Sequence, residues 1–249
     1  MQKILNKEKR IIPVRNIEIT VDRESGVITM MNDGNGVDIA KHPENDLWIP
    51  EMIFGHLRTS TNYKKDEKKI VGGKNGFGFK LVLIYSQWGE IETIDHIRGK
   101  KYTQRFENNL TDILKPTITN CKSRPYTKVS WLPDYKRFGI SKITDDMFNL
   151  FKKRTYDIGV VTDKSVRVKF NGKTVPNKNF EQYMDIYIGP KGENPRLYES
   201  NNKRWEVGAC LSPLDEFTQV SYVNGINTAK GGKHVDYILN QIVKKMVIY

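Results

Sequence analysis

The sequence has only two cysteines, Cys121 and Cys210, which lie far apart and outside any C-x-x-C or Cys/His cluster. Neither a disulfide framework nor a structural zinc site is therefore supported. No apolar run reaches the roughly 18 residues that span a bilayer, and the opening MQKILNKEKRIIPV lacks the apolar segment of a secretory signal. These absences lead us to expect an intracellular protein with no membrane partner.

Positive charge is what the chain has in excess. Its 249 residues carry 41 Lys and Arg against 29 Asp and Glu, a formal net charge of +12. This balance favours a polyanionic partner such as nucleic acid or nucleotide, although it does not say where that partner binds. The 38% of hydrophobic residues is enough for a real core, so a disordered tail or a fibre is ruled out.

Strands and helices alternate in the predicted order of elements. Alternating apolar residues or turn signals predict strands at 17–21, 27–31, 89–94, 126–131, 166–170, 205–210 and 217–223. Helices are expected behind Pro50, behind the glycine cluster that ends at Gly78, between an N-cap at Thr144 and a stop at Gly159, and over 235–246. This alternation indicates an α+β layered architecture, with a boundary near 189–192 and a sheet to cover the apolar stripe of the last helix.

Two polar, flexible loops are the candidate binding residues. Gly73, Gly76 and Gly78 precede a helix, a setting in which backbone N–H groups can approach a phosphate, and Lys74 and Lys80 add positive charge. The spacing fits neither a Walker A loop nor a Rossmann fingerprint, and alone it is equally compatible with a packing device. A second loop, Asn32 to Gly36, follows a predicted strand. With the hydroxyl-rich residues 59–62 it suggests one nucleotide pocket, in which a side-chain amide accepts from the adenine amino group.

At this point the sequence resembles a known family. IFGHLRTSTNY (53–63) and KKIVGGKNGFGFKL (68–81) are similar to the ATPase region of eukaryotic-type type IIA DNA topoisomerases, members of the gyrase, Hsp90, histidine kinase and MutL fold group. The resemblance continues through VSWLPDYKRF (129–138), RTYDIG (154–159), VKFNGK (168–173), RWEVGACLS (204–212) and SYVNGINTAKGGKHVDYILNQIV (221–243). It covers nearly the whole chain, and its character is that of eukaryotes or large DNA viruses.

The resemblance implies a fold and a set of ATP-binding residues. It implies a layered α/β-sandwich ATP-binding domain over 1–187, without its N-terminal catalytic helix, and a partial transducer domain over 188–249. Asn32 would bind adenine, in place of the Asp of the wider group, and Phe79 stands where a small residue is more usual. His234 would be structural. The full implied ATP-binding set is Asn32, Ser60, Thr61, Asn62, Gly73, Lys74, Asn75, Gly76, Phe77, Gly78, Phe79 and Lys80.

The resemblance also implies parts that these residues do not contain. Residues 1–16 lack the glutamate that activates water and the asparagine that holds Mg²⁺, and no Gln-Thr-Lys loop follows the last helix. We therefore expect a fragment with no catalytic or metal-binding residue of its own, which alone hydrolyses ATP negligibly.

The functional expectation is part of the ATP-operated clamp of a DNA topoisomerase. Such an enzyme passes one duplex through a transient double-strand break. The implied cofactors are ATP and Mg²⁺, the partners are DNA and a second copy of the full-length protein, and the location is the nucleus, or the host cell if the protein is viral. The alternative is a non-catalytic module that binds nucleotide or DNA on the same scaffold.

Overall fold

The computed structural model describes residues 12–57, 59, 73, 76–201, 204–212 and 215–248. Contacts divide the chain into two compact units. The first takes in 73–159 and 163–175 together with the N-terminal part of the chain, and most of the second is 176–249. The domain boundary expected between 187 and 188 stays a prediction.

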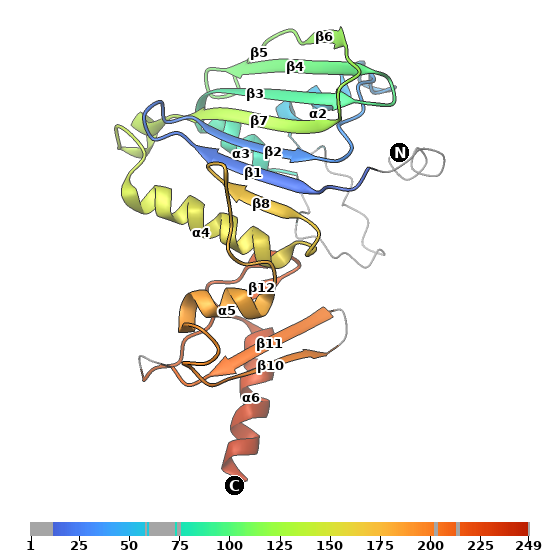
Figure 1. Cartoon of the computed structure of the whole chain (residues 1–249). Coiled ribbons are helices and arrows are strands. Elements are labelled where there is room, and N and C mark those ends of the chain that lie inside the picture. Colours follow the sequence, from blue (N-terminus) through green and yellow to red (C-terminus); the bar gives the residue numbers. More distant parts are fainter. Residues whose placement is uncertain are drawn as a thin grey trace. The chain divides into compact units, whose positions relative to one another are not determined.

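A mixed sheet forms the first unit (Figure 1). Its path through the described residues is β5-β4-β3-β7-β2-β1-β8-β9, and β6 pairs with β4. All neighbours are antiparallel except β1 and β8, which run parallel. The strands are β1 (Asn16–Val21), β2 (Ile28–Asp33), β3 (Ser86–Asp95), β4 (Lys100–Glu107), β5 (Asp112–Ile113), β6 (Thr117–Asn120), β7 (Tyr126–Pro133), β8 (Arg167–Phe170) and β9 (Lys173–Thr174).

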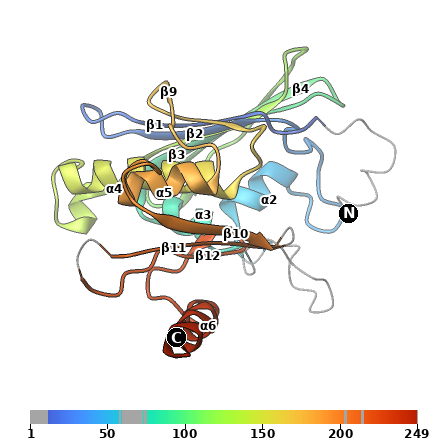
Figure 2. The ribbon, with the colours of Figure 1, turned by 60° about the horizontal axis from the view of Figure 1, so that its bottom comes forward.

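Three helices cover one face of this sheet: α2 (Ile49–Gly55), α3 (Gly78–Ile84) and α4 (Asp145–Val161). Figure 2 shows them on the same side of the strands. Alternate residues of the central strands, among them Ile19, Ile28 and Ile91, point into this layer and are at most 2% exposed. The helices bring Phe54, Phe79 and Phe151 onto that cluster, and the core of the unit is built there.

The second unit is smaller and less buried. It contains α5 (Phe180–Ile188), the pair β10 (Arg196–Asn201) and β11 (Trp205–Cys210), the short hairpin β12 (Tyr222–Val223) and β13 (Ile226–Asn227), and α6 (Lys233–Val247). α5 packs on β11 so closely that a Cβ on Gly208 would lie 2.4 Å from the Met184 sulfur. The His234 ring nitrogen Nε2 lies 3.1 Å from the hydroxyls of Ser221 and Thr228, so it anchors the preceding hairpin to α6.

The α+β fold class is confirmed, and the differences from the expected elements have physical reasons. Gly159 does not end α4, which continues to Val161, because a helical glycine costs only about 1 kcal/mol and packing outweighs it. The strand expected over 217–223 is reduced to Tyr222–Val223, since a turn at 224–225 folds it straight back onto β13. No residue of α6 is buried, so a sheet covering its stripe is not found within the described residues.

Candidate nucleotide-binding site

Lys80 joins two segments that the sequence places in one pocket. It lies in the first turn of α3, is 4% exposed, and donates from Nζ to the Thr59 hydroxyl over 3.1 Å. Thr59 in turn donates to the carbonyl of His56, at the end of α2. Burial lowers the pKa of Lys80, and no carboxylate of the described residues pairs with it. A buried ammonium whose partner among the described residues is a neutral hydroxyl favours an added anion.

The glycines before α3 leave room for such an anion. Gly76 has a φ of +66°, in the left-handed region that suits glycine, and the N-cap residue Phe77 gives the helix no side-chain cap. A Cβ added at Gly73 or Gly78 would meet no atom of the described residues within 4 Å. This part of the chain can therefore approach a ligand with its backbone.

Phe79 has a different place from the rest of its loop. Its ring makes edge-to-face contacts with Phe54, 5.0 Å between centroids, and with Trp131, 6.5 Å. The bulky side chain thus belongs to the core under the sheet, and only the backbone of Phe79 can face a phosphate. The large side chain at a position where a small residue is more usual therefore anchors the start of α3.

Asn32 lies at the end of β2 in a row of residues that crosses the sheet. Ile17 on β1 and Thr127 on β7 are its direct neighbours, and Thr93 on β3 faces Thr127. Facing residues of antiparallel strands share one side of the sheet, so these side chains lie on the helix-covered side. Met30 shares that side yet is 41% exposed, so the sheet face beside Asn32 is open there.

The loop after Asn32 is held by backbone contacts. Asp33 accepts from the N–H groups of Arg15 and Asn16 over 2.7 and 2.8 Å, and Asn35 accepts from Ile12 over 2.9 Å. The Asn16 side chain also donates to Asp33, over 2.6 Å. Burial alone would raise the pKa of Asp33, but the Asn16 side chain and the two backbone N–H groups outweigh it and lower the pKa. The carboxylate therefore fixes the start of β1 and does not face the pocket.

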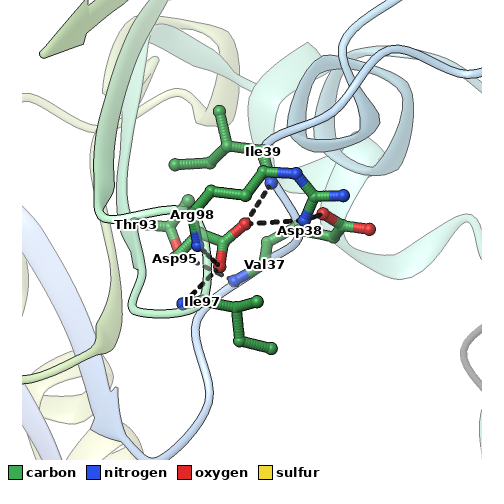
Figure 3. A network of polar contacts seen from close by, with 7 residues as sticks. All are labelled: Val37, Asp38, Ile39, Thr93, Asp95, Ile97 and Arg98. Carbon is green, nitrogen blue, oxygen red and sulfur yellow. Dashed lines mark hydrogen bonds and ion pairs between the residues drawn. The ribbon is translucent and has the colours of Figure 1, made fainter. Parts of the chain in front are cut away.

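A buried network at the end of β3 fixes the other side of this loop (Figure 3). Asp95 accepts from the N–H groups of Ile39, Ile97 and Arg98 over 2.9 to 3.1 Å, and the Arg98 guanidinium also contacts it. Burial alone would raise the pKa of Asp95, but these bonds outweigh it and lower the pKa. Arg98 also pairs with Asp38, so the chain after the loop is tied to β3 twice.

Position 36 requires glycine because the loop passes very close to β3 there. A Cβ there would lie 1.8 Å from the carbonyl oxygen of Ile94 and 3.0 Å from the Thr93 hydroxyl. Any side chain would push the loop away from β3. The second glycine of the Asn32–Gly36 loop thus serves close packing, while Gly34, with a φ of +99°, serves the turn.

Prediction and structure together divide the site residues into three groups. Asn32, Gly73, Gly76, Phe77, Gly78, Phe79 and Lys80 are described, and Thr59 links Lys80 to the hydroxyl-rich segment. Ser60, Thr61, Asn62, Lys74 and Asn75 lie outside the described residues. Met30, Thr93, Asp95 and Thr127 were missed. The available signal was Thr93 itself, a polar residue at the core-facing parity of Gly89 and Ile91.

Over the described ranges, no group of three or more His, Cys, Asp or Glu side chains could hold a metal ion. None of the helices in that part of the chain combines the length and apolarity that crossing a bilayer requires.

Comparisons with known proteins find relatives among the DNA topoisomerases. The family model of DNA gyrase B matches residues 166–249. DNA topoisomerase 2 of Acanthamoeba polyphaga mimivirus is 43% identical over 94% of this chain, and that of Arabidopsis thaliana is 43% identical over 97%. The chain spans 19% and 17% of these two relatives, so it corresponds to less than a fifth of their length.

Solved structures of topoisomerase II regions are also similar to this chain. The ATPase region of Saccharomyces cerevisiae topoisomerase II has a TM-score of 0.88 at 42% identity, with 94% of this chain and 61% of that one covered. The ATPase and transducer domains of topoisomerase II from Balamuthia mandrillaris also score 0.88, at 34% identity, with 94% and 60% covered.

The layered sheet with helices on one face and the buried lysine in the helix after the glycines fit the nucleotide-binding class that the resemblance implied, the gyrase, Hsp90, histidine kinase and MutL group. Within that class the chain is related, over nearly its whole length, to the ATPase region of type II DNA topoisomerases. The resemblance identified from the sequence is confirmed.

Proposed function

We propose that this chain binds ATP between Asn32 and Lys80 and forms part of the ATP-operated clamp of a type IIA DNA topoisomerase. The burial of Lys80 without an anionic partner in the described residues carries the proposal. Triphosphate would supply the missing negative charge. The open sheet face beside Met30 and Asn32 leaves room for the base, whose amino group can donate a hydrogen bond to the Asn32 side-chain oxygen.

The activity of the whole protein is part of the same proposal. Relatives named DNA topoisomerase 2 support a role in changing DNA topology, and the net charge of +12 suits a DNA duplex. We propose Mg²⁺ as a cofactor, with its ligand outside the residues of this chain, and a homodimer of the full-length protein. The proposed location is the nucleus, or the host cell for a viral protein.

Titration of the 249-residue chain with ATP tests the pocket directly. Lys80→Met keeps the length and apolar stem of the side chain but removes its charge, and we expect affinity to fall at least 30-fold, or about 2 kcal/mol. Because the lost charge was buried and no anion of the described residues pairs with it, the ligand-free variant should be at least as stable as the original protein.

Lys128→Met is the matched control. Lys128 pairs with Glu92 on the opposite face of the sheet, so its loss should leave ATP affinity unchanged. Equal affinities for the Lys80 variant and the original chain would contradict the proposed phosphate site.

Measuring ATP hydrolysis together with ATP binding distinguishes part of an ATP-hydrolysing topoisomerase from a non-catalytic binding module. Negligible hydrolysis by residues 1–249 stays a prediction, and Mg²⁺-dependent turnover that Lys80→Met abolishes would contradict it. Hydrolysis by a full-length protein that contains this chain would exclude the non-catalytic binding module.

A further inference from the structure

We propose that Thr93 is a positioning residue that sets the hydrogen-bond polarity of the base site, so that the site selects a 6-amino purine over a 6-oxo purine. This inference rests on the proposed function, since it names the base that the same pocket accepts. Thr93 need not touch the base. It acts through Thr127, its neighbour on β7, which faces Asn32.

The contacts of Thr93 leave one assignment of protons that satisfies all of them. Its hydroxyl oxygen lies 2.9 Å from the Val37 N–H, 3.1 Å from the Tyr126 carbonyl and 3.0 Å from the Thr127 hydroxyl. A hydroxyl has one donor and two acceptor positions, an N–H only donates, and a carbonyl only accepts. Thr93 therefore donates to Tyr126 and accepts from Val37 and from Thr127.

The burial of Thr93 enforces this assignment of the hydroxyl protons. Thr93 is 0% exposed, so bulk water does not compete for its lone pairs or its proton. Leaving any of the three partners unsatisfied would cost about 1–3 kcal/mol, which keeps the Thr127 proton on its bond to Thr93. The Thr127 oxygen consequently presents only lone pairs to the side of the sheet that carries Asn32.

Asn32, like Thr127, presents a hydrogen-bond acceptor to the ligand, and it does so for an independent reason. Its Nδ2 donates to the carbonyl of Asp33 over 2.9 Å, in the adjacent residue. The amide nitrogen is thereby turned toward the backbone, and Oδ1 becomes the atom available to a ligand. Two acceptors, one from β2 and one from β7, therefore face the same place.

Two acceptors at one place distinguish bases by their exocyclic group. The 6-amino group of adenine offers two N–H donors, which match Asn32 and Thr127 directly or through one water. The 6-oxo group of hypoxanthine or guanine is an acceptor and would oppose both. A site built to hydrogen-bond one group rejects the analogue that lacks it, because its own buried atoms stay unsatisfied.

The test compares ATP with ITP, whose 6-oxo group changes the same edge of the base, by calorimetric titration of the 249-residue chain. The original chain should bind ATP on the order of 100-fold more tightly than ITP. Thr93→Val frees the Thr127 hydroxyl to rotate and donate to a 6-oxo group, so the preference should fall below about tenfold, with ITP affinity rising in absolute terms. Thr93→Ser should keep the original preference.

Thr29→Val is the matched control, because Thr29 on β2 and Ser130 on β7 form a similar hydroxyl pair, 2.9 Å apart, on the opposite face of the sheet. Its preference for ATP should be unchanged. A purely structural role for Thr93 would weaken ATP and ITP equally, and an unchanged ratio in Thr93→Val would overturn the inference.

The remaining outcomes are also decisive. If Thr93→Val does not fold, Thr127→Val removes the acceptor itself and must lower the ratio in the same way, and an unchanged ratio there overturns the inference. A chain that binds ATP and ITP equally well contradicts the role of Thr93 but leaves the proposed function standing. A chain that binds neither contradicts the proposed function.

Discussion

The two units of this chain differ in the interactions that stabilise each of them internally. Sixteen of the seventeen buried apolar residues of the described chain belong to the first unit, and Tyr183 on α5 is the only one in the second. The second unit relies on hydrogen bonds between side chains, such as those of Tyr183 and His234. A site that must hold a buried charge and buried hydroxyls in fixed geometry is therefore found in the unit that contains nearly all of these buried apolar side chains.

The largest expected change in the free energy of unfolding comes from a substitution in the core of the first unit. Ile91 on β3 is 0% exposed, so Ile91→Ala should lower the free energy of unfolding by about 2–5 kcal/mol. Met246→Ala on α6, where the side chain is 70% exposed, should change it by less than about 0.5 kcal/mol. Denaturant unfolding measures both changes. Similar values would break the contrast between the units.

The next effect concerns glycines. Gly36→Ala would place a Cβ 1.8 Å from a backbone oxygen, and we expect a loss of about 1–3 kcal/mol together with weaker ATP binding. Gly192 in the second unit has no atom of the described residues within 4 Å of an added Cβ, so Gly192→Ala should be tolerated. Thermal unfolding of both variants tests the pair, and a stable Gly36→Ala protein would contradict the close contact with β3.

The stability of the first unit should depend on pH through Glu92, which lies on the sheet face opposite the helices. Burial alone would raise the pKa of Glu92, but hydrogen bonds from Lys101, Tyr126 and Lys128 outweigh it and lower the pKa to about 2. Because the folded pKa lies below the ordinary 4.5, this stabilisation is present above pH 4.5 and is lost as the pH falls toward 2.

Glu92→Gln measures that contribution. At pH 7 the variant should be less stable by about 1–2 kcal/mol, and its unfolding free energy should converge with that of the original chain as the pH approaches 2. A constant difference between the two pH curves would mean that the ionised carboxylate is not the cause.

The smallest effect is expected in the second unit. The Tyr183 hydroxyl lies 2.9 Å from that of Tyr187 and 2.5 Å from that of Tyr222, so Tyr183→Phe should cost about 1 kcal/mol. Hydrogen exchange of α5 amides should accelerate while exchange in β3 stays unchanged. Faster exchange in both would show that the units unfold together.

Local patterns predicted much of this structure correctly. The hairpin around residues 22–26, the helix after Gly78 and the cap at Thr144, which accepts from the Met147 N–H over 3.2 Å, are all present. β4 and β10 were missed because their residues are charged and polar on the open side, which hides the alternation of a strand. Gly159 misled the prediction because packing of α4 outweighed the local preference of one residue.

By itself the sequence determined which residue types could form a nucleotide pocket, since glycines, a lysine and an asparagine have those properties wherever they lie. Only the tertiary structure decided how they work together. Lys80 is a buried cation because α3 packs under the sheet beside Thr59. The Phe79 side chain points into the core. Thr93 and Thr127 gained their polarity from partners more than thirty residues away along the chain, a relation that strand register creates and no local pattern contains.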